Sequence, residues 1–174
     1  VGDGITNDNT LALTGTAAAG STVQLFDGAT QIGTATANGS GAWTFATATL
    51  TDGSHAFTAK AMDTAGNFSS ASTALNVTVD TVAPGAPTVA SFSPDSNVVG
   101  DGVTNANQIT LTGTAAAGST VKLFDGATQI GTATANGSGA WTFATATLTD
   151  GSHAFTAKAM DTAGNVSAAS AALN

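Results

Sequence analysis

The chain has 174 residues, with 11 aspartates, no glutamate, three lysines and no arginine, which gives a formal charge of −8. Such an acidic surface repels nucleic acid and anionic lipid, and no apolar run approaches the roughly 20 residues that span a bilayer. The 42% of hydrophobic residues and the 32 threonines make the chain rich in β-branched side chains, which favour strands. We therefore expect an all-β protein that binds no nucleic acid and does not insert into a membrane.

The sequence contains an internal repeat. Residues 1–76 align with residues 99–174 at an offset of 98, and they differ at only nine of the 76 positions. A period near 100 residues is too long for a solenoid unit and suits a domain that folds alone. This predicts a first domain at 1–80, a proline-containing linker at 81–86 and a second domain at 87–174, each truncated at one end of a longer array.

Within the second copy, alternating segments are separated by Gly, Asn, Asp and Ser clusters at the spacing typical of a β-sandwich. The pattern predicts seven strands, at 87–92, 107–115, 119–125, 128–135, 140–146, 153–160 and from about 171 onward. The first copy begins at the equivalent of Val99 and lacks a counterpart of the first strand. Its sandwich should therefore have an open edge, which a neighbouring molecule or a tag would fill unless the domain tolerates the gap.

Alternation along the strands assigns an inward face. In the second copy we expect the core to contain Ile109, Leu111, Val121, Leu123, Ile130, Trp141, Phe143, Phe155, Ala157 and Ala159, and in the first copy the last strand should add Leu75, Val77 and Val79. The linker prolines, Pro84 and Pro87, restrict φ and oppose collapse. Two sandwiches arranged end to end are therefore expected.

The sequence offers little for catalysis. Asp52, Ser54 and His55 include the residue types of a hydrolase triad, but neighbours on one strand point to opposite faces and cannot form the relay. With one histidine per repeat and no Cys, Arg or Glu, the chain lacks the sets of residues that acid–base catalysis, nucleophilic catalysis and zinc binding need. We expect no enzyme activity.

Several motifs together resemble one family. They are the linker Asp80-Thr81-Val82-Ala83-Pro84-Gly85-Ala86-Pro87, Gly-Asp-Gly-Val-Thr-Asn at 100–105, Leu-Thr-Gly-Thr-Ala at 111–115, Gly-Ala-Trp-Thr-Phe at 139–143 and Asp-Thr-Ala-Gly-Asn at 161–165. The chain is similar to the bacterial immunoglobulin-like repeats of giant biofilm-associated and RTX-type surface adhesins. That resemblance implies an extracellular location at the bacterial surface, where neighbouring repeats of the same chain form a calcium-rigidified extender that projects a terminal adhesive domain.

The resemblance also implies where calcium would bind. In an immunoglobulin-like topology, Asp3 and Asp161 should lie at facing ends of the two repeats, and Asp80 enters the linker between them. Carboxylates are the ligands that calcium prefers, so this trio predicts one interdomain site, completed by carbonyls near Val82 and in the loop 4–7. Asp63 and Asp101 occupy the equivalent outer positions, where the adjoining linker is absent and the sites should be incomplete.

Two alternatives stay open. Aspartates at turns also cap backbone amides, and for those in Asp-Gly turns, at 27, 52, 125 and 150, that role is expected; Asp95, in the loop 93–105, is not assigned. The competing function is a binding module that recognises a glycan or host protein directly through many weak, repeated sites. A glycan or cell-binding assay on the two repeats separates the two functions.

Overall fold

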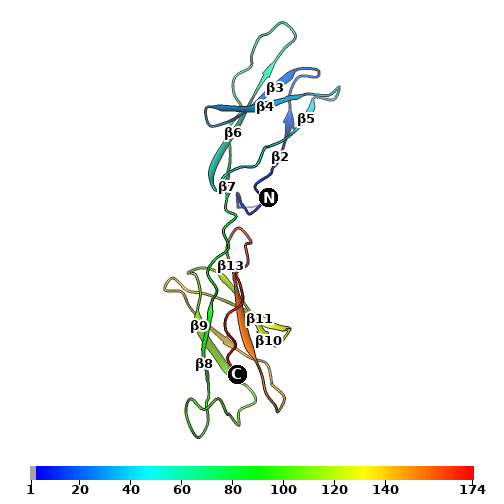
Figure 1. Ribbon diagram of the computed structural model, residues 1–174. Coiled ribbons are helices and arrows are strands. Elements are labelled where there is room, and N and C mark those ends of the chain that lie inside the picture. The colour runs from blue at the N-terminus through cyan, green and yellow to red at the C-terminus, as the bar shows by residue number, and fades with distance from the viewer. Residues whose placement is uncertain (1–2) are drawn as a thin grey trace. The chain divides into compact units, whose positions relative to one another are not determined.

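The computed structural model describes residues 3–174, and the chain divides into two compact units between Thr81 and Val82 (Figure 1). All the secondary structure of the described residues is strand, bridge, turn or bend. This confirms the all-β prediction.

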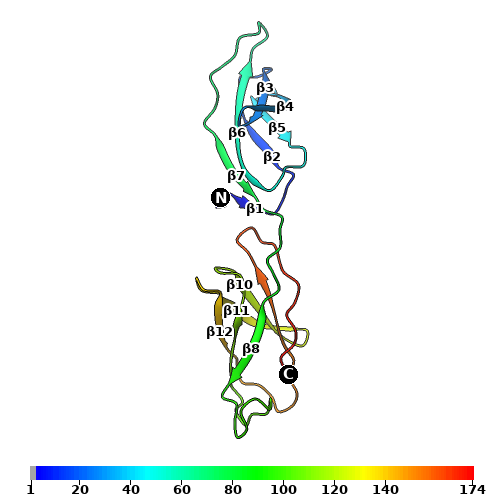
Figure 2. The same cartoon turned by 60° about the vertical axis from the view of Figure 1, so that its left-hand side comes forward.

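Unit one contains seven strands: β1 (Ile5–Thr6), β2 (Ala12–Thr16), β3 (Thr22–Asp27), β4 (Thr30–Thr36), β5 (Ala42–Ala46), β6 (Gly53–Met62) and β7 (Leu75–Val79). Five of them form a sheet in the order β1-β7-β6-β3-β4, and β2 pairs with β5. The short β1 lies parallel to β7, beside it in the view of Figure 2, with Ile5 opposite Thr78. The remaining pairs are antiparallel, as in a sandwich.

Unit two contains β8 (Thr88–Ser93), β9 (Thr110–Thr114), β10 (Thr120–Asp125), β11 (Thr128–Thr134), β12 (Ala140–Ala144) and β13 (Phe155–Met160). One sheet has the order β11-β10-β13 and the other β12-β9-β8. The predicted seventh strand of this unit is wrong, because only an isolated bridge joins Leu173 to Phe155. In unit one, β7 pairs with residues 53–57 of β6. Unit two has no strand equivalent to β7 among its described residues, and β13 begins at Phe155, two residues after the predicted start at 153.

The core of unit two follows the alternation. Leu111, Val121, Leu123, Ala157 and Ala159 are 0% exposed, and Trp141 is 2% exposed. Ile130 and Phe143 are partly buried and pack against this cluster. The inward face predicted from period-two alternation is therefore confirmed for this unit.

The core of unit one is less completely covered. Val23, Leu25 and Val79 are 1% exposed, but Leu75 is 56% exposed. The inward assignment of Leu75 is therefore wrong. Its counterpart Leu173 packs against the core of unit two, so the burial of this side chain depends on what packs against it and not on alternation alone.

A bulge shapes one hairpin in each unit. In unit one the register between β3 and β4 shifts after Leu25, which lies opposite Gly33. Gly33 has a φ of +159°, and a Cβ there would overlap the ring of Phe45. Glycine therefore leaves room for the ring of Phe45 beside this hairpin, and Gly131 leaves the same room for the ring of Phe143 in unit two.

Candidate metal-binding residues

Asp3 and Asp80 belong to the same pair of strands in unit one. Asp3 precedes β1, and its Oδ1 accepts a hydrogen bond from the backbone N–H of Ile5 at 3.0 Å. Asp80 follows β7, and its backbone N–H donates to the carbonyl of Thr6 at 2.9 Å. Because β1 and β7 are parallel, Asp3 lies before the paired segment and Asp80 after it. Backbone hydrogen bonds therefore fix the two segments beside each other.

Two of the carbonyl groups predicted to complete the shell already accept hydrogen bonds. The carbonyl of Gly4 accepts from the N–H of Thr78 at 2.7 Å, and that of Thr6 accepts from Asp80. A carbonyl oxygen has a second lone pair, so these bonds position the groups without excluding a cation.

Asp52 is a carboxylate that the sequence did not place beside the linker. Its Oδ1 accepts hydrogen bonds from the backbone N–H and the hydroxyl of Thr81, at 3.1 and 2.9 Å. The antiparallel register sets Gly53 opposite Val79, which carries Asp52 to the level of Asp80. Two aspartates of unit one thus lie where the chain leaves β7. The position of Asp52 depends on the register between β6 and β7, which the sequence pattern alone did not predict.

Asp63 and Asp161 each organise a five-residue loop. The Oδ1 of Asp63 accepts from the backbone N–H groups of Ala65 and Asn67, and its Oδ2 accepts from the side-chain amide of Asn67, all at 2.9 Å. Asn165 makes the same two contacts with Asp161. Each loop turns through a glycine of positive φ, Gly66 and Gly164, a conformation that glycine adopts without steric cost.

These hydrogen bonds keep both carboxylates ionised. The side-chain amide of Asn67 is the main reason that the pKa of Asp63 lies below its ordinary value. For Asp161 desolvation raises the pKa, but the hydrogen bonds from Asn165, Gly164 and Ala163 together outweigh it and the pKa is lowered. At neutral pH both side chains are therefore anionic, as a calcium ligand must be.

The acidic residues of the loop 93–105 are also tied to backbone amides. The Oδ1 of Asp101 accepts from the N–H of Val103 at 2.9 Å, which repeats the contact of Asp3 in unit one. The Oδ2 of Asp95 accepts from the N–H of Gly100 at 2.6 Å. Capping of local turns is thus a common role of the aspartates in this chain.

The predicted ligands come from both units. Residues 3–174 contain no group of three or more His, Cys, Asp or Glu side chains placed to hold a metal ion. The chemistry of the predicted set, in which every side-chain ligand is a carboxylate oxygen of aspartate, fits a hard cation such as calcium. The trio Asp3, Asp80 and Asp161 stays a prediction.

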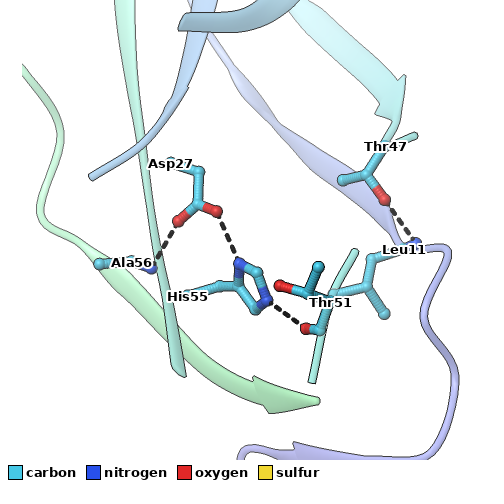
Figure 3. Close-up of polar contacts among 6 residues, drawn as sticks. All are labelled: Leu11, Asp27, Thr47, Thr51, His55 and Ala56. Atoms are coloured by element: carbon cyan, nitrogen blue, oxygen red, sulfur yellow. Dashed lines mark hydrogen bonds and ion pairs between the residues drawn. The ribbon is translucent and has the colours of Figure 1, made fainter. Parts of the chain in front are cut away.

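A histidine–aspartate pair in each unit was missed by the sequence interpretation. The Nδ1 of His55 lies 2.6 Å from the Oδ2 of Asp27, and its Nε2 lies 2.9 Å from the carbonyl oxygen of Thr51 (Figure 3). The Oδ1 of Asp27 also accepts from the N–H of Ala56 at 3.1 Å. Asp27 is thus more than a turn residue, because it connects the end of β3 to β6.

The two acceptors favour the charged imidazolium, in which both ring nitrogens donate. The hydrogen bond to Asp27, followed by that to Thr51, raises the pKa of His55. Since both nitrogens have partners other than Ser54, the ring is not arranged as a base for that hydroxyl. His153, Asp125 and Thr149 repeat the arrangement in unit two with the same distances.

The comparisons with known proteins assign the fold of both units. A family model described as a bacterial Ig-like domain matches residues 1–81 and again residues 84–174. The chain belongs to the bacterial Ig-like domain family. The chain therefore holds two such domains in tandem.

Relatives of this tandem occur within larger proteins. Exoglucanase B of Cellulomonas fimi is 37% identical over 157 residues, which cover 86% of this chain and 13% of that protein. The fibronectin(III)-like modules of Clostridium thermocellum CbhA share the fold, with a TM-score of 0.57 and 21% identity over 95% of this chain and 83% of that one. A 1.5-MDa bacterial ice-binding adhesin has 26% identity and a TM-score of 0.45, over 92% of this chain and 55% of the solved one.

The bacterial Ig-like tandem spans about an eighth of the length of the exoglucanase. Within residues 3–174, no helix has the length and apolar character needed to cross a bilayer.

Proposed function

We propose that this chain is a pair of non-catalytic spacer repeats from an extracellular bacterial surface adhesin, whose role is to extend and stiffen the protein that carries them. The observation that carries the proposal is the near-identity of the two Ig-like domains, which differ at nine of 76 aligned positions. Equivalent domains placed in series lengthen the protein that carries them without giving it a new kind of binding surface. A bacterial Ig-like tandem is suited to that role.

The polar groups of the two domains support a structural role. The one histidine of each domain is bound through both ring nitrogens. The carboxylates of Asp63 and Asp161 cap their own loops. Side chains that would otherwise carry chemistry are therefore used to fix strands and turns.

Calcium is the second part of the proposal. We assign the ligands of a junction site to Asp3, Asp80 and Asp161, with Asp63 and Asp101 as the equivalent, incomplete outer positions. Two observations support it: the lowered pKa of Asp161 keeps that proposed ligand anionic, and Asp52 adds a carboxylate beside Thr81, where the chain leaves β7. A bound divalent ion would offset repulsion among these carboxylates and restrict bending.

A display experiment tests the spacer function. One, two or four copies of the pair are inserted between a membrane anchor and a binding domain of known ligand on a bacterial surface. Capture of ligand-coated beads through a surface polymer layer should improve with copy number, and an unrelated rigid spacer of equal length should substitute for the repeats. If the repeats alone, without the binding domain, capture glycan-coated beads or host cells in a saturable manner, the chain is a binding module and the pure spacer role is wrong.

A further inference from the structure

Each unit carries an Asn-Gly turn that connects strands of two different sheets. In unit one, Asn38 and Gly39 lie between β4 and β5, and the backbone N–H of Gly41 donates to the carbonyl of Asn38 at 2.9 Å. In unit two, Asn136 and Gly137 lie between β11 and β12 in the same way. Both residues of each Asn-Gly pair are exposed. Water and dissolved bases therefore reach both pairs.

The side-chain oxygen of each asparagine accepts three hydrogen bonds. The Oδ1 of Asn38 accepts from the backbone N–H of Ser40 at 2.9 Å, from the hydroxyl of Ser40 at 2.7 Å and from the N–H of Ala42 at 3.0 Å. The Oδ1 of Asn136 accepts the same three bonds from Ser138 and Ala140. Such donors withdraw electron density from the amide carbon and stabilise negative charge that develops on the oxygen. The turn therefore makes Cγ of each asparagine more electrophilic.

The glycine that follows each asparagine supplies a nucleophile. The backbone nitrogen of Gly39 is joined to Cγ of Asn38 through that asparagine's own main chain and side chain, so its attack on Cγ closes a five-membered imide ring within one molecule. Among residues 3–174, the N–H of Gly39 has no hydrogen-bond acceptor. Glycine has no Cβ to hinder the approach, and a Cβ at this position would meet no atom within 4 Å. The nitrogen is therefore neither engaged nor shielded.

We propose that Asn38 and Asn136 are sites of spontaneous deamidation, at which the hydrogen bonds of the turn assist attack by the nitrogen of the following glycine. A base in the solvent takes the amide proton of Gly39, and the nitrogen then forms a bond to Cγ of Asn38. The Cγ–Nδ2 bond breaks, and Nδ2 takes a proton from water and leaves as ammonia. Water opens the resulting succinimide to aspartate or isoaspartate, and it is the only co-reactant.

The two products change the turn differently. An aspartate at position 38 presents a carboxylate oxygen to the same three donors, in hydrogen bonds that its charge strengthens, and makes the formal charge of −8 more negative by one at each site. Isoaspartate lengthens the main chain at position 38 and displaces the backbone groups that pair with Gly41 and Ala42. Each repeat therefore becomes more acidic with age, and the isoaspartate form loosens the connection between its sheets. The proposal is independent of calcium and of the spacer role.

The test follows the whole chain during incubation at neutral and at mildly alkaline pH. Peptide mass spectrometry separates each asparagine from its acid product, and chromatography separates aspartate from isoaspartate. We expect Asn38 and Asn136 to react faster than Asn76, which is followed by the bulky Val77, and both rates to increase with pH. Because the two turns are identical, a variant in unit one leaves Asn136 as the reference within the same molecule.

Variants of unit one separate the role of the glycine from that of the turn. Gly39→Ala should suppress the reaction at Asn38 and leave that at Asn136 unchanged. This variant should fold, because the φ of Gly39 is not positive and a methyl group there meets no atom within 4 Å. Ser40→Ala removes one donor and should slow the reaction at Asn38 by roughly three- to tenfold, the factor that one ordinary hydrogen bond supplies. Ser40→Thr keeps the hydroxyl and should react at the parent rate.

Two results would overturn the proposal. One is that Asn38 and Asn136 stay amides over a period in which a synthetic peptide of residues 35–43 deamidates, because the folded turn would then protect the side chain. The other is that Ser40→Ala reacts at Asn38 as fast as the parent chain or faster, because the hydrogen bonds to Oδ1 would then not assist the attack.

Discussion

The imidazole of His55 lies 2.6 Å from the carboxylate of Asp27, with the histidine side chain 10% exposed and the aspartate 25% exposed. His153 and Asp125 repeat this pair at the same distance in unit two. Each pair joins two neighbouring strands of a sheet, so the charge state of one histidine per domain affects the stability of that domain.

The first prediction concerns pH. The pKa of His55 is raised above 6.5 mainly by its hydrogen bond to Asp27, and that of His153 mainly by its hydrogen bond to the carbonyl of Thr149. A raised pKa in the folded state gives stability that is complete below the unfolded value and is lost as pH rises through the folded value. Thermal stability should therefore fall as the pH rises above about 6.5, by about 1 kcal/mol per domain, the size of a typical intramolecular hydrogen bond.

Thermal melts of His55→Phe, His153→Phe and the double variant check this prediction. Phenylalanine keeps the ring that stacks on Phe57 at a centroid distance of 5.7 Å but donates no hydrogen bond. Each single variant should lose the pH dependence of its own domain, and the double variant should melt at nearly the same temperature at pH 6 and pH 8. An unchanged pH dependence in the double variant would show that other groups cause it.

The second prediction concerns acid. Asp63 and Asp161 have pKa values below 3.8 in the folded chain, because Asn67 and Asn165 donate hydrogen bonds to them against the cost of burial. A lowered pKa gives stability that is present above the unfolded value and is lost as pH falls through the folded one. Asp63→Asn and Asp161→Asn should therefore destabilise their domains at pH 6 and much less at pH 2. Equal destabilisation at both values would mean that the loops do not depend on the charge.

The third prediction concerns the end of unit two. A groove of about 710 Å³ lies between Phe92, Leu148, Phe155 and Leu173, at the place that residues 77–79 occupy in unit one. There Val79 is 1% exposed and pairs with Gly53. Appending Val-Thr-Val-Asp after Asn174 should bury two valines and add on the order of 2 kcal/mol, or about 10 °C in the Tm of unit two.

The matched control for this extension appends Asn-Thr-Asn-Asp, which offers the same backbone without the apolar side chains. This control extension should raise the Tm of unit two much less. If the two extensions stabilise unit two equally, backbone pairing rather than burial accounts for the effect and the reasoning from Val79 fails.

The sequence predicted features that repeat locally and missed those that depend on register or on a neighbour. Period-two alternation placed Leu111, Val121 and Leu123 in the core because each faces inward within its own strand. It failed for Leu75, whose burial depends on a strand packed over it. It also missed the pairing of Asp27 with His55, 28 residues apart, because the contact depends on how β3 and β6 align.

The aspartates of the candidate site show the same distinction between features set by local sequence and features set by strand register. The loops of Asp63 and Asp161 follow from the local Asp-Thr-Ala-Gly-Asn sequence, where an aspartate reaches amides two and four residues ahead. The position of Asp52 beside Thr81 depends on the register of β6 with β7. The proposed ligation of calcium by Asp3, Asp80 and Asp161 would involve both domains, and no local pattern determines it.

The fourth prediction concerns calcium and stability. Extracellular calcium modules have dissociation constants of about 0.1 to 1 mM, so 10 mM calcium would add on the order of 2.7 kcal/mol at the tighter end. The Tm should rise by several degrees relative to EDTA, and Asp80→Ala should abolish the rise. An equal Tm in EDTA and in excess calcium would leave the aspartates as turn residues only.

The central claim, a spacer stiffened by calcium, is tested most directly by the distance distribution between the two domains. The chain has no cysteine, so Thr30→Cys and Thr128→Cys, at equivalent exposed positions, accept one label each. Asp80→Ala removes a proposed ligand, and Asp8→Ala is the matched control, because it removes the same charge at a position that is alanine in the other copy. Calcium should narrow the distance distribution in the parent chain and in Asp8→Ala but not in Asp80→Ala. If the parent chain and both variants give equally narrow distributions in EDTA, the claim is contradicted and the stiffness is assigned to the linker prolines.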